Sequence, residues 1–214
     1  MQRRKFLSIA LLSMPGFGVA FAQGRGFVPL YNGKDLTGWH AKDGRLDVWK
    51  AKGEILSCSG GGGGWLTTDR EFSDFELRVE WKIAAGGNSG IGIRYPAKGD
   101  PAHAGMEIQI LDDDAPDYKN LQAAQYTGGV YYQVPPKAKP AKAPGEWNRY
   151  VIRCQGPRIR IWLNGVEIQN VNVEEQTKGE GGHLPLSQRP RNGYVGLQSH
   201  TGPVEFRNIE IREL

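Results

Sequence analysis

The chain has 214 residues, a net charge of +4, 23% charged residues and two cysteines. Its basic residues are scattered, and part of the excess lies in the first few residues, so the sequence lacks the clustered basic surface of a nucleic-acid-binding protein. A chain of this length can form one all-β domain with a sizeable core.

Residues 1–22 are typical of an export signal. Arg3 and Arg4 begin a charged segment, an apolar run follows at 9–12, and Ala20-Phe21-Ala22 is a small-x-small cleavage site. The paired arginines are typical of twin-arginine export. Because the apolar run is too short to span a bilayer, we expect 23–214 to be a single periplasmic or extracellular domain with no stable membrane insertion after signal removal. A retained anchor is the alternative.

Alternation of apolar and polar residues predicts strands along the rest of the chain, and no segment has a helical period. The alternation is clearest at 75–83, where Phe75, Leu77, Val79, Trp81 and Ile83 share one face. Other strands are expected at 27–31, 49–50, 54–58, 88–94, 106–111, 127–132, 150–154, 158–163, 166–171, 193–200 and 204–213, with a β-bulge near Asn208. Strands without intervening helices predict an all-β fold, an antiparallel β-sandwich or jelly roll.

Residues 86–114 contain two strands with unusual polar faces. The side chains that alternate with the apolar ones are Gly90, Gly92, Arg94, Glu107 and Gln109. Glycines leave room beside a few polar groups, as a small-molecule site requires. We therefore expect this face to form the floor of a pocket, the alternative being an ordinary Arg94–Glu107 ion pair on a solvated face.

Three further features leave alternatives open. The glycine run Gly60–Gly64 leads into Trp65, which belongs either to the core or to a pocket rim. Asp112 begins a run of three aspartates that suits either a solvated turn or a calcium or magnesium site. Cys58 and Cys154 each share the phase of an apolar neighbour, so they form either a disulfide or two small buried hydrophobic residues.

An ordered set of short motifs extends over nearly the whole of 23–214. The motifs are Tyr31-Asn-Gly-Lys-Asp-Leu-Thr-Gly-Trp39, Asn88-Ser-Gly-Ile-Gly-Ile-Arg94, Glu107-Ile-Gln-Ile-Leu-Asp112, Thr127-Gly-Gly-Val-Tyr131, Glu146-Trp-Asn148, Asn164-Gly165, Gly196-Leu-Gln-Ser-His200 and Phe206-Arg-Asn-Ile209. Together they resemble the bacterial 3-keto-disaccharide hydrolase domain family. The resemblance implies a concanavalin A-like jelly roll, an exported protein, and hydrolysis of glycosides whose sugar is oxidised at C3. The glycine run and the triple aspartate depart from the family pattern.

A ketone at C3 makes the C2 proton acidic and places the glycosidic oxygen β to the carbonyl, so the bond can break by elimination and water can then add to the enone. Such a path needs a base, an acid and a donor at the enolate oxygen. We expect Glu107 and His200 to be base and acid in either order, and Arg94 to stabilise the enolate. Asn88, Gln109, Tyr131 and Gln198 are expected to hold sugar hydroxyls, with Trp65 stacking on the ring.

Asp112 is expected either to orient His200 or to bind a divalent metal ion that replaces Arg94. The alternative to an enzyme is a non-catalytic, lectin-like carbohydrate-binding module. A conventional glycosidase would need two facing carboxylates, and no second carboxylate in phase with Glu107 is evident. The oligomeric state is left open by the sequence.

Overall fold

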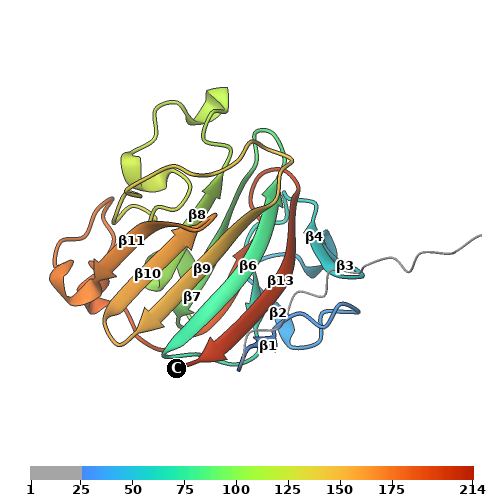
Figure 1. Ribbon diagram of the computed structural model, residues 1–214, viewed down its shortest axis with the longest axis horizontal. Coiled ribbons are helices and arrows are strands. Elements are labelled where there is room, and N and C mark those ends of the chain that lie inside the picture. The colour runs from blue at the N-terminus through green and yellow to red at the C-terminus, as the bar shows by residue number, and fades with distance from the viewer. Residues whose placement is uncertain (1–25) are drawn as a thin grey trace, which may run out of the picture.

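The computed structural model describes residues 26–214 as strands, short helices and connecting loops (Figure 1). The predicted export signal at 1–22 lies outside the described residues. In the described part, no helix has both the length and the apolar character needed to cross a bilayer.

Within 26–214 the strands are β1 (Val28–Pro29), β2 (Trp39–Lys42), β3 (Trp49–Lys52), β4 (Ile55–Cys58), β5 (Trp65–Thr68), β6 (Phe75–Ile83), β7 (Asn88–Tyr95), β8 (Met106–Leu111), β9 (Asn148–Gln155), β10 (Arg158–Leu163), β11 (Val166–Asn172), β12 (Tyr194–Gln198) and β13 (Val204–Glu213). One short helix, α1 (Pro101–Ala104), and 3-10 turns at Leu46–Val48, Pro116–Tyr118, Ala123–Gln125, Val173–Glu175 and Leu186–Gln188 complete the elements.

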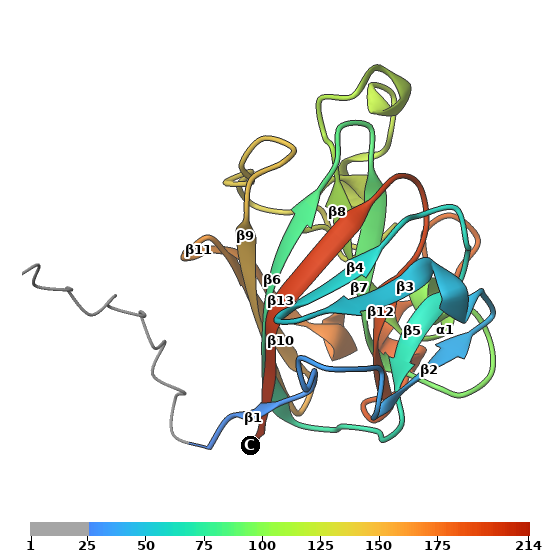
Figure 2. The same cartoon turned by 90° about the vertical axis from the view of Figure 1, so that its right-hand side faces the viewer.

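The strands form two antiparallel sheets, which confirms the predicted sandwich. The larger sheet has the order β11-β10-β9-β6-β13-β4-β3, with β1 paired to β13, and the smaller has the order β2-β5-β12-β7-β8. Figure 2 shows β9, β6 and β13 on one side and β12, β5 and β2 on the other. The core lies between the sheets, and the predicted apolar face of β6 is buried in it.

Local sequence sets several boundaries as predicted. Asn164-Gly165 turns the chain between β10 and β11, with both residues at positive φ. Pairing of β13 with β6 shifts register between Arg207 and Glu210, and Asn208 has a φ of 50°. The predicted bulge is therefore confirmed. The strand predicted at 127–132 is wrong, because Val130 makes only isolated bridges, to Ile108 and Val134, in a chain of turns.

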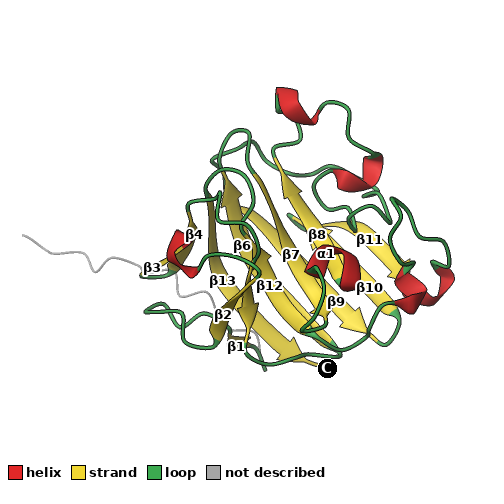
Figure 3. Cartoon of the chain, turned by 180° about the vertical axis from the view of Figure 1, so that it is seen from behind, coloured by secondary structure: helices red, strands yellow, loops and turns green. Residues whose placement is uncertain are grey.

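The smaller sheet is also covered on its outer face. Helix α1, in the connection between β7 and β8, lies over these two strands on the side away from the core (Figure 3). Its Pro101 follows Asp100, whose carboxylate accepts a hydrogen bond from Ala102 N at 2.8 Å and caps the turn. The strand pattern did not reveal this helix because it contains only one turn.

The disulfide alternative for the cysteines is wrong. Cys58 and Cys154 are both buried and free. They lie on β4 and β9, which are separated in the sheet by β13 and β6, so their backbones are at least about 14 Å apart at the usual strand spacing. A disulfide needs a Cα separation of less than about 7 Å.

Candidate functional site

The site centres on Glu107, in the middle of β8. Antiparallel pairing places Gly92 opposite Glu107 and Gly90 opposite Gln109. Both polar side chains lie on the outer face of the smaller sheet, as predicted, yet each is only 2% exposed. The alternative of an Arg94–Glu107 ion pair on a solvated face is therefore wrong, and this face is a second buried layer.

The surroundings of Glu107 favour its protonated form. A Cβ at Gly90 would lie 2.0 Å from Glu107 Oε1, so the carboxyl group packs directly on the β7 backbone. The Gln109 amide, oriented to satisfy both of its polar atoms, donates to Glu107 Oε1 at 3.2 Å and to Ser89 O at 3.0 Å. Burial, and then the nearby Asp100 carboxylate, raise the pKa of Glu107 well above its usual value.

The space left by the glycines is filled by the protein itself, which corrects the expectation of an open floor. A Cβ at Gly196 would lie 2.3 Å from Tyr95 Oη, and one at Gly92 would lie 2.8 Å from Tyr95 Cε1 and 3.1 Å from Trp65 Cζ3. Tyr95 donates to Thr67 Oγ1 at 2.7 Å. The glycines therefore allow two aromatic rings to pack on the sheet beside Glu107.

Arg94 does not point toward this face, which corrects its predicted orientation. Between the Gly92–Gly196 and Tyr95–Tyr194 pairs, β7 contains one residue more than β12. Arg94, in this bulge, has a φ of 50°. This bulge reverses the alternation, so Tyr95 takes the outer face.

The guanidinium of Arg94 is completely buried and joins the two sheets. It donates to Ser73 O at 2.7 Å, to Gly156 O at 2.8 Å and to Asp74 Oδ1 at 2.9 Å. Three bonds to backbone and carboxylate acceptors leave this group a structural role.

A pocket of about 350 Å³ opens beside the two aromatic rings. It is lined by Asp43, Gly61, Gly63, Gly64, Trp65, Asp100, Pro101, Gln198, Ser199, His200 and Thr201. The structure thus brings together the predicted residues Trp65, Gln198 and His200. Trp65 is only 4% exposed, but it packs on the outer face of the smaller sheet rather than in the core between the sheets, and it lines the pocket.

Several pocket residues offer polar atoms to a ligand, among them Ser199, whose buried Oγ has no hydrogen-bond partner among the described residues. Gln198 Oε1 is buried and has no hydrogen-bond partner among the described residues, as expected of a group awaiting a ligand hydroxyl. His200 lies at the pocket mouth with Nδ1 2.8 Å from Thr201 Oγ1. Partial loss of solvent around the ring lowers the pKa of His200 and favours neutral imidazole.

Asp100 is a site residue that the sequence analysis missed. It lines the pocket with His200 and raises the pKa of Glu107 electrostatically. A second carboxylate therefore does accompany Glu107, contrary to the expectation from strand phase. Strand alternation cannot reveal it because it comes from a loop; the signal was Asp100-Pro101, a common start to a helical turn.

The remaining predicted binding residues, Asn88, Gln109 and Tyr131, do not line the pocket. Asn88 begins β7 and bonds through its backbone to Thr201, next to His200. Tyr131 is half-buried, its Oη accepts from Gln125 Nε2 at 3.3 Å, and burial raises its pKa. Its ring lies 6.1 Å from that of His103 on α1, and His103 stacks on His183 at 3.5 Å.

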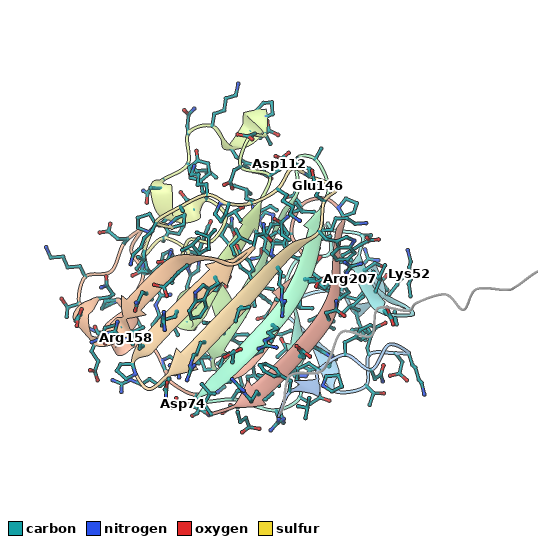
Figure 4. All side chains as sticks on the ribbon, viewed as in Figure 1. Lys52, Asp74, Asp112, Glu146, Arg158 and Arg207 are labelled. Carbon is teal, nitrogen blue, oxygen red and sulfur yellow. The ribbon has the colours of Figure 1, made fainter. Side chains whose placement is uncertain are left out.

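Asp112 is held in a turn. Its Oδ2 accepts from Gly86 N at 2.8 Å, while Asp113 accepts from Thr127 N and Oγ1. Within 26–214 no group of three side chains suited to metal binding occurs, so these donors do not fit a metal site. Figure 4 shows Asp112 and Asp74, the Arg94 partner, at opposite ends of the strands.

Comparison with known proteins gives consistent matches over most of the chain. The model of a family described as the 3-keto-alpha-glucoside-1,2-lyase-like domain matches residues 26–212. A protein of Bacteroides thetaiotaomicron named 3-keto-disaccharide hydrolase is 28% identical, over 88% of this chain and 79% of the relative. A Parabacteroides distasonis crystal structure named "putative glycosyl hydrolase" is 28% identical with a TM-score of 0.79, over 88% of this chain and 99% of that one.

Laminarinase from Rhodothermus marinus shares 13% identity with a TM-score of 0.57, over 87% of this chain and 95% of that one. A similarity at this identity concerns the fold alone, and it agrees with the expected jelly-roll β-sandwich.

The contacts of Arg94 predict a stability defect rather than a catalytic one. Arg94→Met should lower the free energy of unfolding by about 3 kcal/mol, because it leaves two backbone carbonyls without their donor and removes one of the two donors to Asp74 Oδ1. Urea denaturation measures this loss. Arg207→Met is the matched control, since Arg207 pairs with Glu80 at a partly exposed position and should lose less than about 1 kcal/mol. If Arg94→Met is as stable as the wild type but no longer turns over a 3-keto-glucoside, then Arg94 takes part in the reaction, contrary to this prediction.

Proposed function

Because this chain belongs to the 3-keto-alpha-glucoside-1,2-lyase-like domain family, we propose that it is a glycoside-cleaving hydrolase acting on 3-keto-glycosides such as 3-keto-disaccharides. The observation that carries the proposal is the buried Glu107 carboxyl beside a pocket containing His200 and unpaired Gln198 Oε1. The Bacteroides relative named 3-keto-disaccharide hydrolase supports the same substrate class.

The opposite pKa shifts support one order of the two proton-transfer roles that the sequence left open. A lowered pKa keeps His200 neutral near pH 7 and able to accept a proton, whereas a raised pKa keeps the proton on Glu107. We therefore assign His200 as the base that removes the C2 proton and Glu107 as the acid that protonates the departing glycosidic oxygen. Asp100 lines the pocket and raises the pKa of Glu107 electrostatically, so Glu107 lies near the wall of the pocket.

The pocket also supplies charge stabilisation without Arg94. After accepting the C2 proton, His200 is an imidazolium, and the other charged residues lining the pocket are Asp43 and Asp100. The cation therefore forms next to the enolate when the enolate develops. Elimination then gives an enone, water adds at C1, and the net reaction is hydrolysis. Trp65 and the Gln198 amide hold the ring.

We also propose that residues 1–22 direct export and that 23–214 act as one domain in the periplasm or outside the cell. The paired arginines and cleavage site support this. A carbohydrate is the expected partner.

The proposed reaction predicts which substrates the protein cleaves. The protein should release the aglycone from a 3-keto-glucoside and not from the unoxidised parent, because only the ketone makes the C2 proton acidic. Glu107→Gln and His200→Ala should each reduce the rate at least 100-fold, as measured by chromatography. Glu54→Gln, at an exposed turn position, should retain activity.

Two other results would contradict this proposal. Cleavage of the unoxidised parent would indicate a conventional glycosidase, for which Glu107 and Asp100 supply the carboxylates. Binding without cleavage of either compound, measured by calorimetry, would indicate the lectin-like alternative.

The assigned proton-transfer roles predict how kcat/KM depends on pH. kcat/KM should rise as His200 loses its proton, through a pKa below the usual histidine value, and fall as Glu107 loses its proton, through a pKa above the usual glutamate value. Residual activity of Glu107→Gln should lack the alkaline fall and keep the acidic rise. If the variant instead loses the acidic rise, the two roles are reversed.

A further inference from the structure

A second cleft adjoins the pocket on the outer face of the smaller sheet. It measures about 260 Å³ and is lined by His40, Ala41, Lys42, Asp43, Thr67, Ala97 and Tyr194. Asp43 lines both cavities, and the segment before α1 borders both, through Ala97 in the cleft and Asp100 in the pocket. The two cavities therefore form one groove along β5 and β12. Binding sites for small molecules usually measure about 300–1,000 Å³, a range that the combined groove reaches.

The charged side chains of the cleft are already neutralised. Lys42 is largely buried, and its Nζ contacts Asp43 Oδ2 at 2.6 Å. His40 Nδ1 lies 2.8 Å from Asp69 Oδ1. The Lys42–Asp43 ion pair and the His40–Asp69 hydrogen bond offer polar groups to sugar hydroxyls without selecting a charged ligand.

The aromatic side of the cleft is Tyr194. Its ring is half-buried, meets the His40 ring edge-on with centroids 6.2 Å apart, and packs at 6.0 Å against Tyr95. Tyr95 in turn packs against Trp65 of the pocket, with centroids 6.1 Å apart. A continuous row of aromatic rings thus connects the two cavities, and a ring of this kind beside paired polar groups suits the apolar face of a sugar.

We propose that this cleft binds the leaving part of the substrate, a neutral second sugar ring, while the oxidised ring occupies the pocket of Trp65, Gln198 and His200. The inference rests on the proposed function and adds to it an orientation: the second ring extends from the pocket along the sheet toward Tyr194. Tyr194 is then a specificity residue for glycosides whose aglycone is a sugar.

The test compares two substrates with the same oxidised ring, a 3-keto-disaccharide and its methyl 3-keto-glucoside counterpart. Tyr194→Ala should lower kcat/KM for the disaccharide about tenfold or more and leave the methyl glucoside nearly unchanged. Tyr194→Phe, which keeps the ring, should retain most of the activity. Trp162→Ala on β10 of the other sheet is the control for loss of a partly exposed aromatic. An equal loss for both substrates, or no loss for either, would overturn the assignment.

A separate measurement distinguishes failure of this inference from failure of the proposed function. If the wild-type protein cleaves neither substrate, the proposed function is wrong. Calorimetry with an unoxidised disaccharide and its methyl monosaccharide then tests ligand binding to the cleft alone. Weaker binding of the disaccharide to Tyr194→Ala, with monosaccharide binding unchanged, would support the second-ring subsite. Equal binding of the disaccharide to both proteins would overturn it.

Discussion

The site depends on one costly feature, a carboxyl group buried against the backbone of β7. Glu107 is 2% exposed, and the charged group that acts on it is the like-charged Asp100. Its protonated form stabilises the fold; that contribution is fully present below the usual glutamate pKa and is lost as the pH rises through the raised pKa. The glycine at position 90, the Gln109 amide and the Tyr150 hydroxyl, which donates to Gln109 O at 2.7 Å, hold it in place.

Arg94 has the complementary role of fixing the strand that carries those glycines. Its bonds to Ser73, Asp74 and Gly156 connect the end of β7 to the loops of the larger sheet. The bulge that turns Arg94 inward also turns Tyr95 outward, onto Gly92 and Gly196. One left-handed residue therefore sets both the connection between the sheets and the aromatic row beneath the groove.

Strand periodicity was sufficient to predict the sandwich, the buried face of β6, the bulge near Asn208 and the outward placement of Glu107. These features depend on local alternation and turn chemistry. Periodicity failed at Arg94 because one extra residue reverses the phase, and at the glycines because it cannot tell open space from space filled by distant rings. Asp100 was missed because a loop returns it to the sheet, and such a return is set by tertiary contacts.

The central claim is that Glu107 holds its proton more tightly than an ordinary glutamate. Carboxyl-carbon NMR of glutamate-labelled protein, with Glu107→Gln to assign the signal, measures this directly over a pH titration. The account predicts a Glu107 midpoint well above the usual glutamate value of 4.5. A midpoint at or below 4.5 would contradict the account.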